Sequence, residues 1–236
     1  MEREPGKLPG LTFEEAAGNV KKNLEALGKP SQEESVKQEF LQVYNSRVNR
    51  RDGAVAMLKW LERNGFFEAP ASRKHHLAQP GGLALHSLNV WHRLREITVR
   101  DLTDRDAPGV RHLSEAEEET VAILGLLHDV CKVGVYHQTD PFKAAAEGKL
   151  ATMAPYEFRD PFPLGHGEKS LYLITRHMVL TEEEALAIRW HMGAYDDAVK
   201  GGSRSMTEAM NLTQWVWRLQ EADMCAAWID ERSAAE

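Results

Sequence analysis

The stretch that decides the fold is VAILGLLHDVCK, residues 121–132, in which seven small or apolar residues lead directly into a His-Asp pair. A Ser-x-x-Glu pattern that begins at Ser114 is typical of a helix start, because both side chains satisfy free amides of the first turn. We therefore expect a helix from Ser114 to about Val130 that carries His128 and Asp129 near its end. A charged Asp is costly to bury after such an apolar run unless a partner such as a divalent cation compensates it. The alternative is a helix end that has reached solvent.

The same start and stop signals predict helices over most of the chain. Further Ser/Thr-x-x-Glu patterns begin at Thr12, Ser31 and Thr181. Several of the segments with apolar residues at helical spacing are followed by Gly or Pro, which end a helix. The expected helices cover residues 13–27, 32–48, 53–64, 83–99, 114–130, 167–177, 182–192 and 207–229. Residues 133–158 break the helical rhythm and indicate a small β-hairpin. The predicted fold class is all-α, a helical bundle with one small hairpin insertion after the His-Asp helix.

Length and composition exclude several classes of protein. A chain of 236 residues is long enough to bury one sizeable core without disulfides, and its two Cys are too few for a disulfide framework or a Cys-built zinc site. The formal net charge of −7 argues against a general nucleic-acid coat. The longest apolar run, residues 121–127, is far shorter than the ~20 residues that span a bilayer. The first residues, MEREPGK, lack the apolar stretch of a secretory signal, so we expect a cytoplasmic protein without a membrane association.

Ten His are present, and several lie at helix positions that suit a ligand. His86 lies in an apolar helix face, His166 lies between two glycines at a helix start, and His191 ends a helix. Asp223 interrupts a helix that is otherwise rich in Trp and Ala. Each of them also has an ordinary structural interpretation, because a lone His in an apolar helix is more often a satisfied core residue than a ligand.

Taken in order, these residues resemble a known family. The segments GGLALHSLNV, LLHDVCK, GHGEKS and AIRWHMG, followed by Asp223, are similar to the short characteristic stretches of the HD-domain metal-dependent phosphohydrolase superfamily. The resemblance is to the bacterial two-metal form, in which further His residues follow the His-Asp pair. It covers residues of about 75 to 230.

The resemblance implies a metal centre with two divalent ions. His86, His128, Asp129 and Asp223 would hold the first ion, and Asp129 would bridge to a second ion that His166 and His191 also hold. Imidazole and carboxylate donors suit Mn, Fe, Ni, Zn or Mg and do not choose among them. Two such ions ~3.5–4 Å apart would generate a bridging hydroxide that attacks phosphorus.

Basic residues near these ligands are the candidates for phosphate contact. Lys132 follows Asp129 by three positions, about one turn if the helix continues, and a Lys at this place is common in HD hydrolases. We expect a catalytic role for Asp129 and Lys132, and substrate contacts from Lys132, Lys169 and His76. The alternative for Lys169 is an exposed solubilising charge.

The function that we expect is hydrolysis of a phosphoester or phosphoanhydride bond in a phosphorylated small molecule, with a nucleotide as the favoured substrate. An HD-type nuclease that acts on single-stranded nucleic acid is one alternative, although the acidic composition counts against it. A non-catalytic sensor that binds a nucleotide is the other. All six ligand positions are filled, which argues for an enzyme.

Two regions are expected in the chain. Residues 66–236 would form the HD phosphohydrolase domain, and residues 1–65 would form an N-terminal helical extension outside the resemblance. The helices of this extension could pack on the catalytic core, cover the site or mediate a homodimer. We expect them to pack on the core as one compact unit, because their apolar faces need burial.

Overall fold

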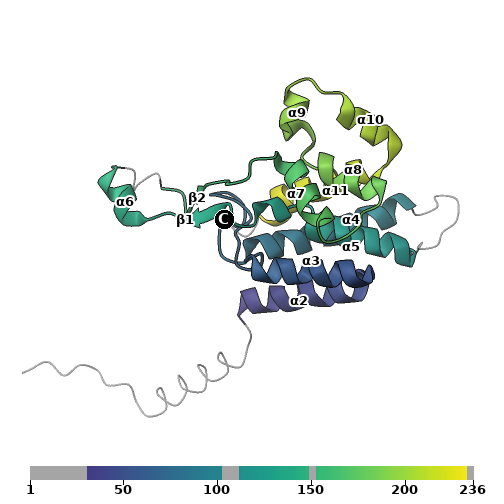
Figure 1. The fold of residues 1–236 in the computed structure, drawn as a ribbon, viewed down its shortest axis with the longest axis horizontal. Helices are drawn as coiled ribbons and strands as arrows, with labels where there is room; N and C mark the ends of the chain where they lie inside the picture. Colours follow the sequence, from purple (N-terminus) through teal and green to yellow (C-terminus); the bar gives the residue numbers. More distant parts are fainter. Residues whose placement is uncertain (1–30, 103–111, 149–152, 233–236) are drawn as a thin grey trace, which may run out of the picture.

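The computed structural model describes residues 31–102, 112–148 and 153–232, and nearly all of its regular structure is helical (Figure 1). The only sheet in these ranges has two antiparallel strands. The prediction of an all-α fold with one small hairpin is therefore confirmed. Within the same ranges, no helix is both long and apolar enough to cross a membrane.

The first two helices of the described residues contribute side chains to the common core. Helix α2 (Gln32–Arg47) begins at Ser31, whose hydroxyl accepts a hydrogen bond from the Glu34 amide at 3.2 Å, as its sequence pattern predicts. Its residues Phe40 and Tyr44 are buried, and so are Met57 and Leu61 of α3 (Arg51–Arg63). The helix expected over residues 13–27, with its cap at Thr12, lies outside the described residues.

Helices α4 (Gly82–Leu102) and α5 (Glu115–Leu127) pack against each other at the centre of the molecule. Ser114 and Glu117 form the predicted reciprocal cap at the start of α5. The predicted continuation to Val130 is wrong, because α5 ends at Leu127 and a short 3₁₀ turn follows over Val130–Lys132. This turn changes the direction of the chain directly after the His-Asp pair.

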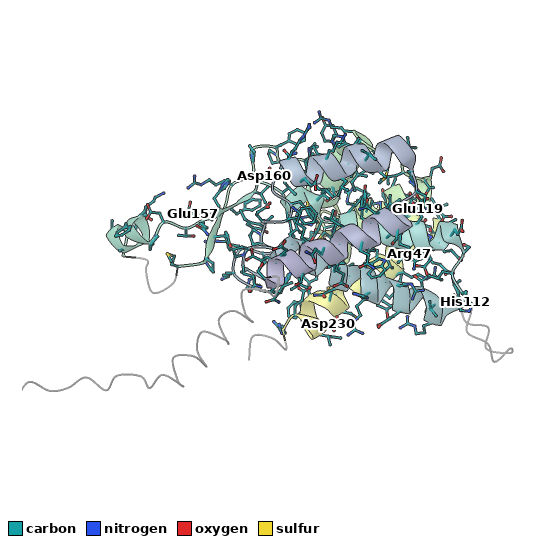
Figure 2. The ribbon with its side chains drawn as sticks, turned by 90° about the horizontal axis from the view of Figure 1, so that it is seen from below. Arg47, His112, Glu119, Glu157, Asp160 and Asp230 are labelled. Atoms are coloured by element: carbon teal, nitrogen blue, oxygen red, sulfur yellow. The ribbon has the colours of Figure 1, made fainter. Side chains whose placement is uncertain are left out.

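The predicted hairpin forms an arm at one end of the molecule (Figure 1). Strand β1 (Tyr136–Gln138) pairs with β2 (Tyr156–Phe158), and the short helix α6 (Pro141–Ala146) lies between them. Figure 2 shows Glu157 on this arm and Asp160 where the arm joins the helical body. The arm therefore leaves the body within a few residues of the His-Asp pair and returns just before the next helix.

The remaining helices are α7 (His166–Thr175), α8 (Glu182–Trp190), α9 (Asp197–Lys200), α10 (Ser205–Leu212) and α11 (Trp215–Cys225), followed by a π turn over Ala226–Asp230. The single helix predicted over residues 207–229 is wrong. Thr213 is extended, with φ −148° and ψ 139°, and its hydroxyl accepts a hydrogen bond from the Trp215 amide at 3.3 Å. This break allows α11 to pack against both α4 and α8.

Candidate metal centre

Five helices bring the six predicted ligands to one place. His86 lies in the first turns of α4, His128 caps α5 and is followed by Asp129, and His166 is the first residue of α7. His191 caps the end of α8, and Asp223 lies in α11. Their donor atoms form overlapping groups of three, each within 4.8 Å, so residues up to 137 positions apart in sequence meet in space.

The carboxylate of Asp129 lies at the centre of this cluster, and its two oxygens face different sets of partners. Oδ1 is 2.6 Å from Nε2 of His166 and 3.5 Å from Nε2 of His191. Oδ2 is 3.5 Å from Nε2 of both His86 and His128. Nε2 of His86 also lies 3.2 Å from Oδ1 of Asp223. The carboxylate therefore joins a His86/His128/Asp223 group to a His166/His191 group, one through each oxygen.

The backbone orients two of these imidazoles. Nδ1 of His128 bonds to the carbonyl of Gly125 at 3.0 Å, and Nδ1 of His191 bonds to that of Ile188 at 2.7 Å. Because a carbonyl only accepts, each Nδ1 carries a proton, and Nε2 is the nitrogen that each ring can offer to a cation as a lone pair. These two Nε2 atoms and that of His86 are buried, with no hydrogen-bond partner among the residues that the structure describes.

The imidazole of His86 is held by a residue that no sequence pattern singles out. Nδ1 of His86 lies 2.8 Å from Oε1 of Glu231, and both side chains are about 1% exposed. Nothing in the sequence around Glu231, which follows a helix among other charged residues, distinguishes it from a surface acid. Only the tertiary fold indicates its position.

The charges in the cluster are strongly coupled. Burial raises the pKa of Asp129, but Lys132, His128 and His166 outweigh it and hold this pKa well below its usual value. Burial lowers the pKa of His86, yet Asp129, Asp223 and Glu231 raise it well above its usual value. Burial lowers the pKa of His128 to about 4, so this ring is neutral at pH 7. The buried carboxylates thus require nearby positive charge, which protons or cations can provide.

This donor set fits a divalent ion. Buried Nε2 atoms without partners point toward two ionised carboxylates, and imidazole with carboxylate suits several transition metals. Metal ions and protons compete for such ligands. The carboxylates that raise the pKa of His86 would equally favour a cation, which would displace the proton from this ring. His86, His128, Asp223 and Oδ2 of Asp129 would hold one ion, and His166, His191 and Oδ1 would hold another.

Of the three residues expected at the substrate, Lys132 lies closest to the cluster. Its Nζ is 2.5 Å from Oδ2 of Asp129, because the 3₁₀ turn keeps it beside the carboxylate although the helix has ended. His76 lies next to His86, with ring centroids 5.2 Å apart. Lys169 is buried and forms an ion pair with Asp160 at 2.6 Å, so it is not the exposed charge of the alternative interpretation. A phosphate contact from Lys169 would require this ion pair to open.

Cys131 also lies at the cluster. Its Sγ is 3.5 Å from both ring nitrogens of His166. Burial lowers the pKa of His166, but Cys131 and Asp129 raise it to about 10. The thiol therefore belongs to the immediate surroundings of the His166/His191 group.

Close contact between α7 and α8 keeps His166 and His191 together. A Cβ added at Gly167 would lie 2.1 Å from the backbone oxygen of Arg189, which cannot move without shifting α8. We expect Gly167→Ala to separate the two helices, destabilise the protein by about 1–3 kcal/mol and weaken binding of one divalent ion. Thermal unfolding and calorimetric titration with Mn²⁺ would measure these effects.

Gly201→Ala is the matched control, because its added Cβ comes no closer than 3.3 Å to another atom and its backbone φ of −75° suits any residue. It should unfold and bind Mn²⁺ like the wild type. Wild-type Mn²⁺ binding and stability in Gly167→Ala would show that the spacing of α7 and α8 does not control the centre.

Comparison with protein families gives one match, to the family described as HD domain, over residues 83–228. No curated protein and no solved structure matches the chain. The matched range is more than half of the chain and includes all six candidate ligands. It leaves out α2, α3 and Glu231.

Proposed function

The chain belongs to the HD domain family, which comprises metal-dependent hydrolases, and we propose that it cleaves a phosphoester or phosphoanhydride bond of a nucleotide. The observation that carries this proposal is the position of Asp129, whose two oxygens face two separate groups of histidines. A carboxylate in this position suits a bridging ligand. Two divalent ions held there would supply a water molecule of lowered pKa as nucleophile and neutralise charge on the phosphoryl group.

The residues of the chain have separate tasks in this proposal. The backbone carbonyls of Gly125 and Ile188 fix the ring orientations of His128 and His191, so these ligands need no reorganisation during turnover. Lys132 lies beside Asp129 with its side chain 13% exposed, and its ammonium can donate hydrogen bonds to phosphate oxygens. Lys132 would therefore orient the phosphate toward the metal centre.

Among the six candidate ligands, His166 has the most exposed side chain. His166 is 31% exposed, whereas the side chains of His86, His128 and His191 are at most 1% exposed. A cavity of about 60 Å³ adjoins it, lined in part by Glu168, Tyr195 and Asp197. Because Glu168, Asp196 and Asp197 line this cavity, it would admit an anionic phosphate only beside bound metal ions, and its volume would leave the rest of a nucleotide outside it.

An aromatic pair on the arm supports a nucleotide as the substrate class. The rings of Tyr136 and Phe158 are 5.8 Å apart, and Phe158 is 58% exposed. Burial raises the pKa of Tyr136, and the charges of Lys132 and Asp129 also act on it. A base could stack on such a surface while its phosphate reaches Lys132.

A substrate panel tests this proposal. The protein is stripped with a chelator, reloaded with Mn²⁺, Fe²⁺, Ni²⁺ or Zn²⁺, and assayed on nucleoside mono-, di- and triphosphates, cyclic dinucleotides and single-stranded oligonucleotides. We expect nucleotide hydrolysis only in the reloaded protein, with two ions per chain by elemental analysis. Turnover that survives complete removal of metal would contradict the mechanism.

The same panel distinguishes the alternatives. Cleavage of the oligonucleotide, with binding that weakens steeply as salt rises, would indicate a nuclease. Nucleotide binding without turnover by the loaded protein would indicate a sensor.

A further inference from the structure

A buried carboxylate lies directly behind His86, on the side away from the other ligands. Oε1 of Glu231 is 2.8 Å from Nδ1 of His86 and accepts a hydrogen bond from Nδ2 of Asn89 at 3.1 Å. Glu231 is buried, although it lies beyond the range matched by the HD family. Burying an ionised carboxylate costs free energy unless a positive charge or hydrogen-bond donors compensate it.

The π turn explains how the C-terminal segment places Glu231 at this position. Glu231 follows Asp223 by eight residues, which in an uninterrupted α-helix would leave the two side chains about 80° apart around the axis. The π turn over Ala226–Asp230 rotates less per residue, and the Glu231 amide bonds to the carbonyl of Ala226 at 3.0 Å. Glu231 thereby returns to the side of α11 that carries Asp223.

The three buried imidazoles differ in what supports them. Neutral carbonyls hold Nδ1 of His128 and His191, whereas an ionised carboxylate holds Nδ1 of His86. A carboxylate partner fixes the ring and the position of its proton, and it also makes Nε2 a stronger donor to a cation. Nε2 of His86 points toward Asp129 and Asp223, at 3.5 Å and 3.2 Å.

We infer that Glu231 is a positioning residue that orients His86 and raises the affinity of the His86/His128/Asp223 group for its divalent ion. This inference rests on the proposed metal-dependent function. It makes the end of the C-terminal turn, which extends beyond the HD match, part of the support of the metal centre. It also predicts an asymmetry, because the His166/His191 group has no contact with Glu231 among the described residues.

Two substitutions at Glu231 test the inference. Glu231→Ala removes the hydrogen-bond acceptor and the charge, and we expect the affinity for one of two Mn²⁺ ions to fall by about 10–100-fold. Glu231→Gln keeps an amide oxygen that can accept from Nδ1, so its loss should be smaller. The affinity for the second ion should stay at the wild-type value in both variants. Calorimetric titration of metal-stripped protein measures both affinities, and thermal unfolding without metal reports on folding.

Asp230→Asn is the matched control. Asp230 is the adjacent acid, pairs with Arg93, and lies on the outer side of the C-terminal turn in Figure 2. It should bind both ions normally. The inference would be overturned if Glu231→Ala and Glu231→Gln each bound two Mn²⁺ ions with the affinities of the wild type.

The remaining outcomes separate this inference from the proposed function. If the wild type binds no divalent ion, the proposed function itself fails. If the wild type binds three ions, and one of them is lost in both Glu231→Ala and His76→Ala, Glu231 is a direct ligand. Nε2 of His76 lies 3.8 Å from Oε2 of Glu231, so this outcome has a defined structural basis and would overturn a positioning role.

Discussion

Asp129→Asn is expected to reduce hydrolysis by about three orders of magnitude, equivalent to about 4 kcal/mol of transition-state stabilisation. Removal of a single group that stabilises a transition state commonly costs about 10²–10³ in rate. Asp129 faces both histidine groups, and an amide nitrogen in place of one oxygen cannot bind a cation. The variant should also lose metal, which elemental analysis would show beside the rate measurement.

Asp140→Asn is a suitable control for this experiment. Asp140 caps α6 on the arm by accepting from the amides of Phe142 and Lys143, and Asn caps a helix equally well. Its activity and metal content should equal those of the wild type. Wild-type hydrolysis by Asp129→Asn after treatment with a chelator would show that the centre around Asp129 is not the site of the reaction.

The sequence predicted most of what depends on neighbouring residues. The caps at Ser114 and Thr181 and the buried face of α2 follow from side chains a few positions apart, and the structure contains all of them. The six candidate ligands were found by a family pattern rather than by geometry. No spacing along the chain shows that the two oxygens of Asp129 face different histidines, because those histidines come from four different helices.

Features that depend on distant contacts were not predicted. The extended Thr213 divides the expected final helix because α11 must turn to pack on α4 and α8, and Thr itself does not forbid a helix. Glu231 reaches His86 only because a π turn changes the rotation of the chain, and the sequence of this turn carries no known signal. In both cases the tertiary packing decides the local conformation.

Glu184→Ala is expected to destabilise the protein by about 1–3 kcal/mol, because it removes a fully buried carboxylate with its hydrogen bonds, while Arg50 keeps Glu119 and the carbonyl of Val179 as partners. Glu184 is fully buried and its carboxylate binds the guanidinium of Arg50 through two hydrogen bonds, of 2.6 Å and 2.8 Å. It also accepts from the hydroxyl of Thr120 at 2.9 Å and completes the cap with Thr181. One carboxylate thus joins the residue before α3 to α5 and α8.

This prediction also tests the proposal that residues 31–65 fold as one unit with the HD domain. Chemical denaturation of the wild type, Glu184→Ala, Arg50→Ala and the double variant gives the coupling energy between the two residues. Glu183→Ala, the exposed neighbour in the same helix, is the control and should change stability little. If the N-terminal helices and the core form one cooperative unit, a single transition shifts in each variant. Two separate transitions, with only one shifted by Arg50→Ala, would show that α2 and α3 unfold independently of the helices that carry the metal centre.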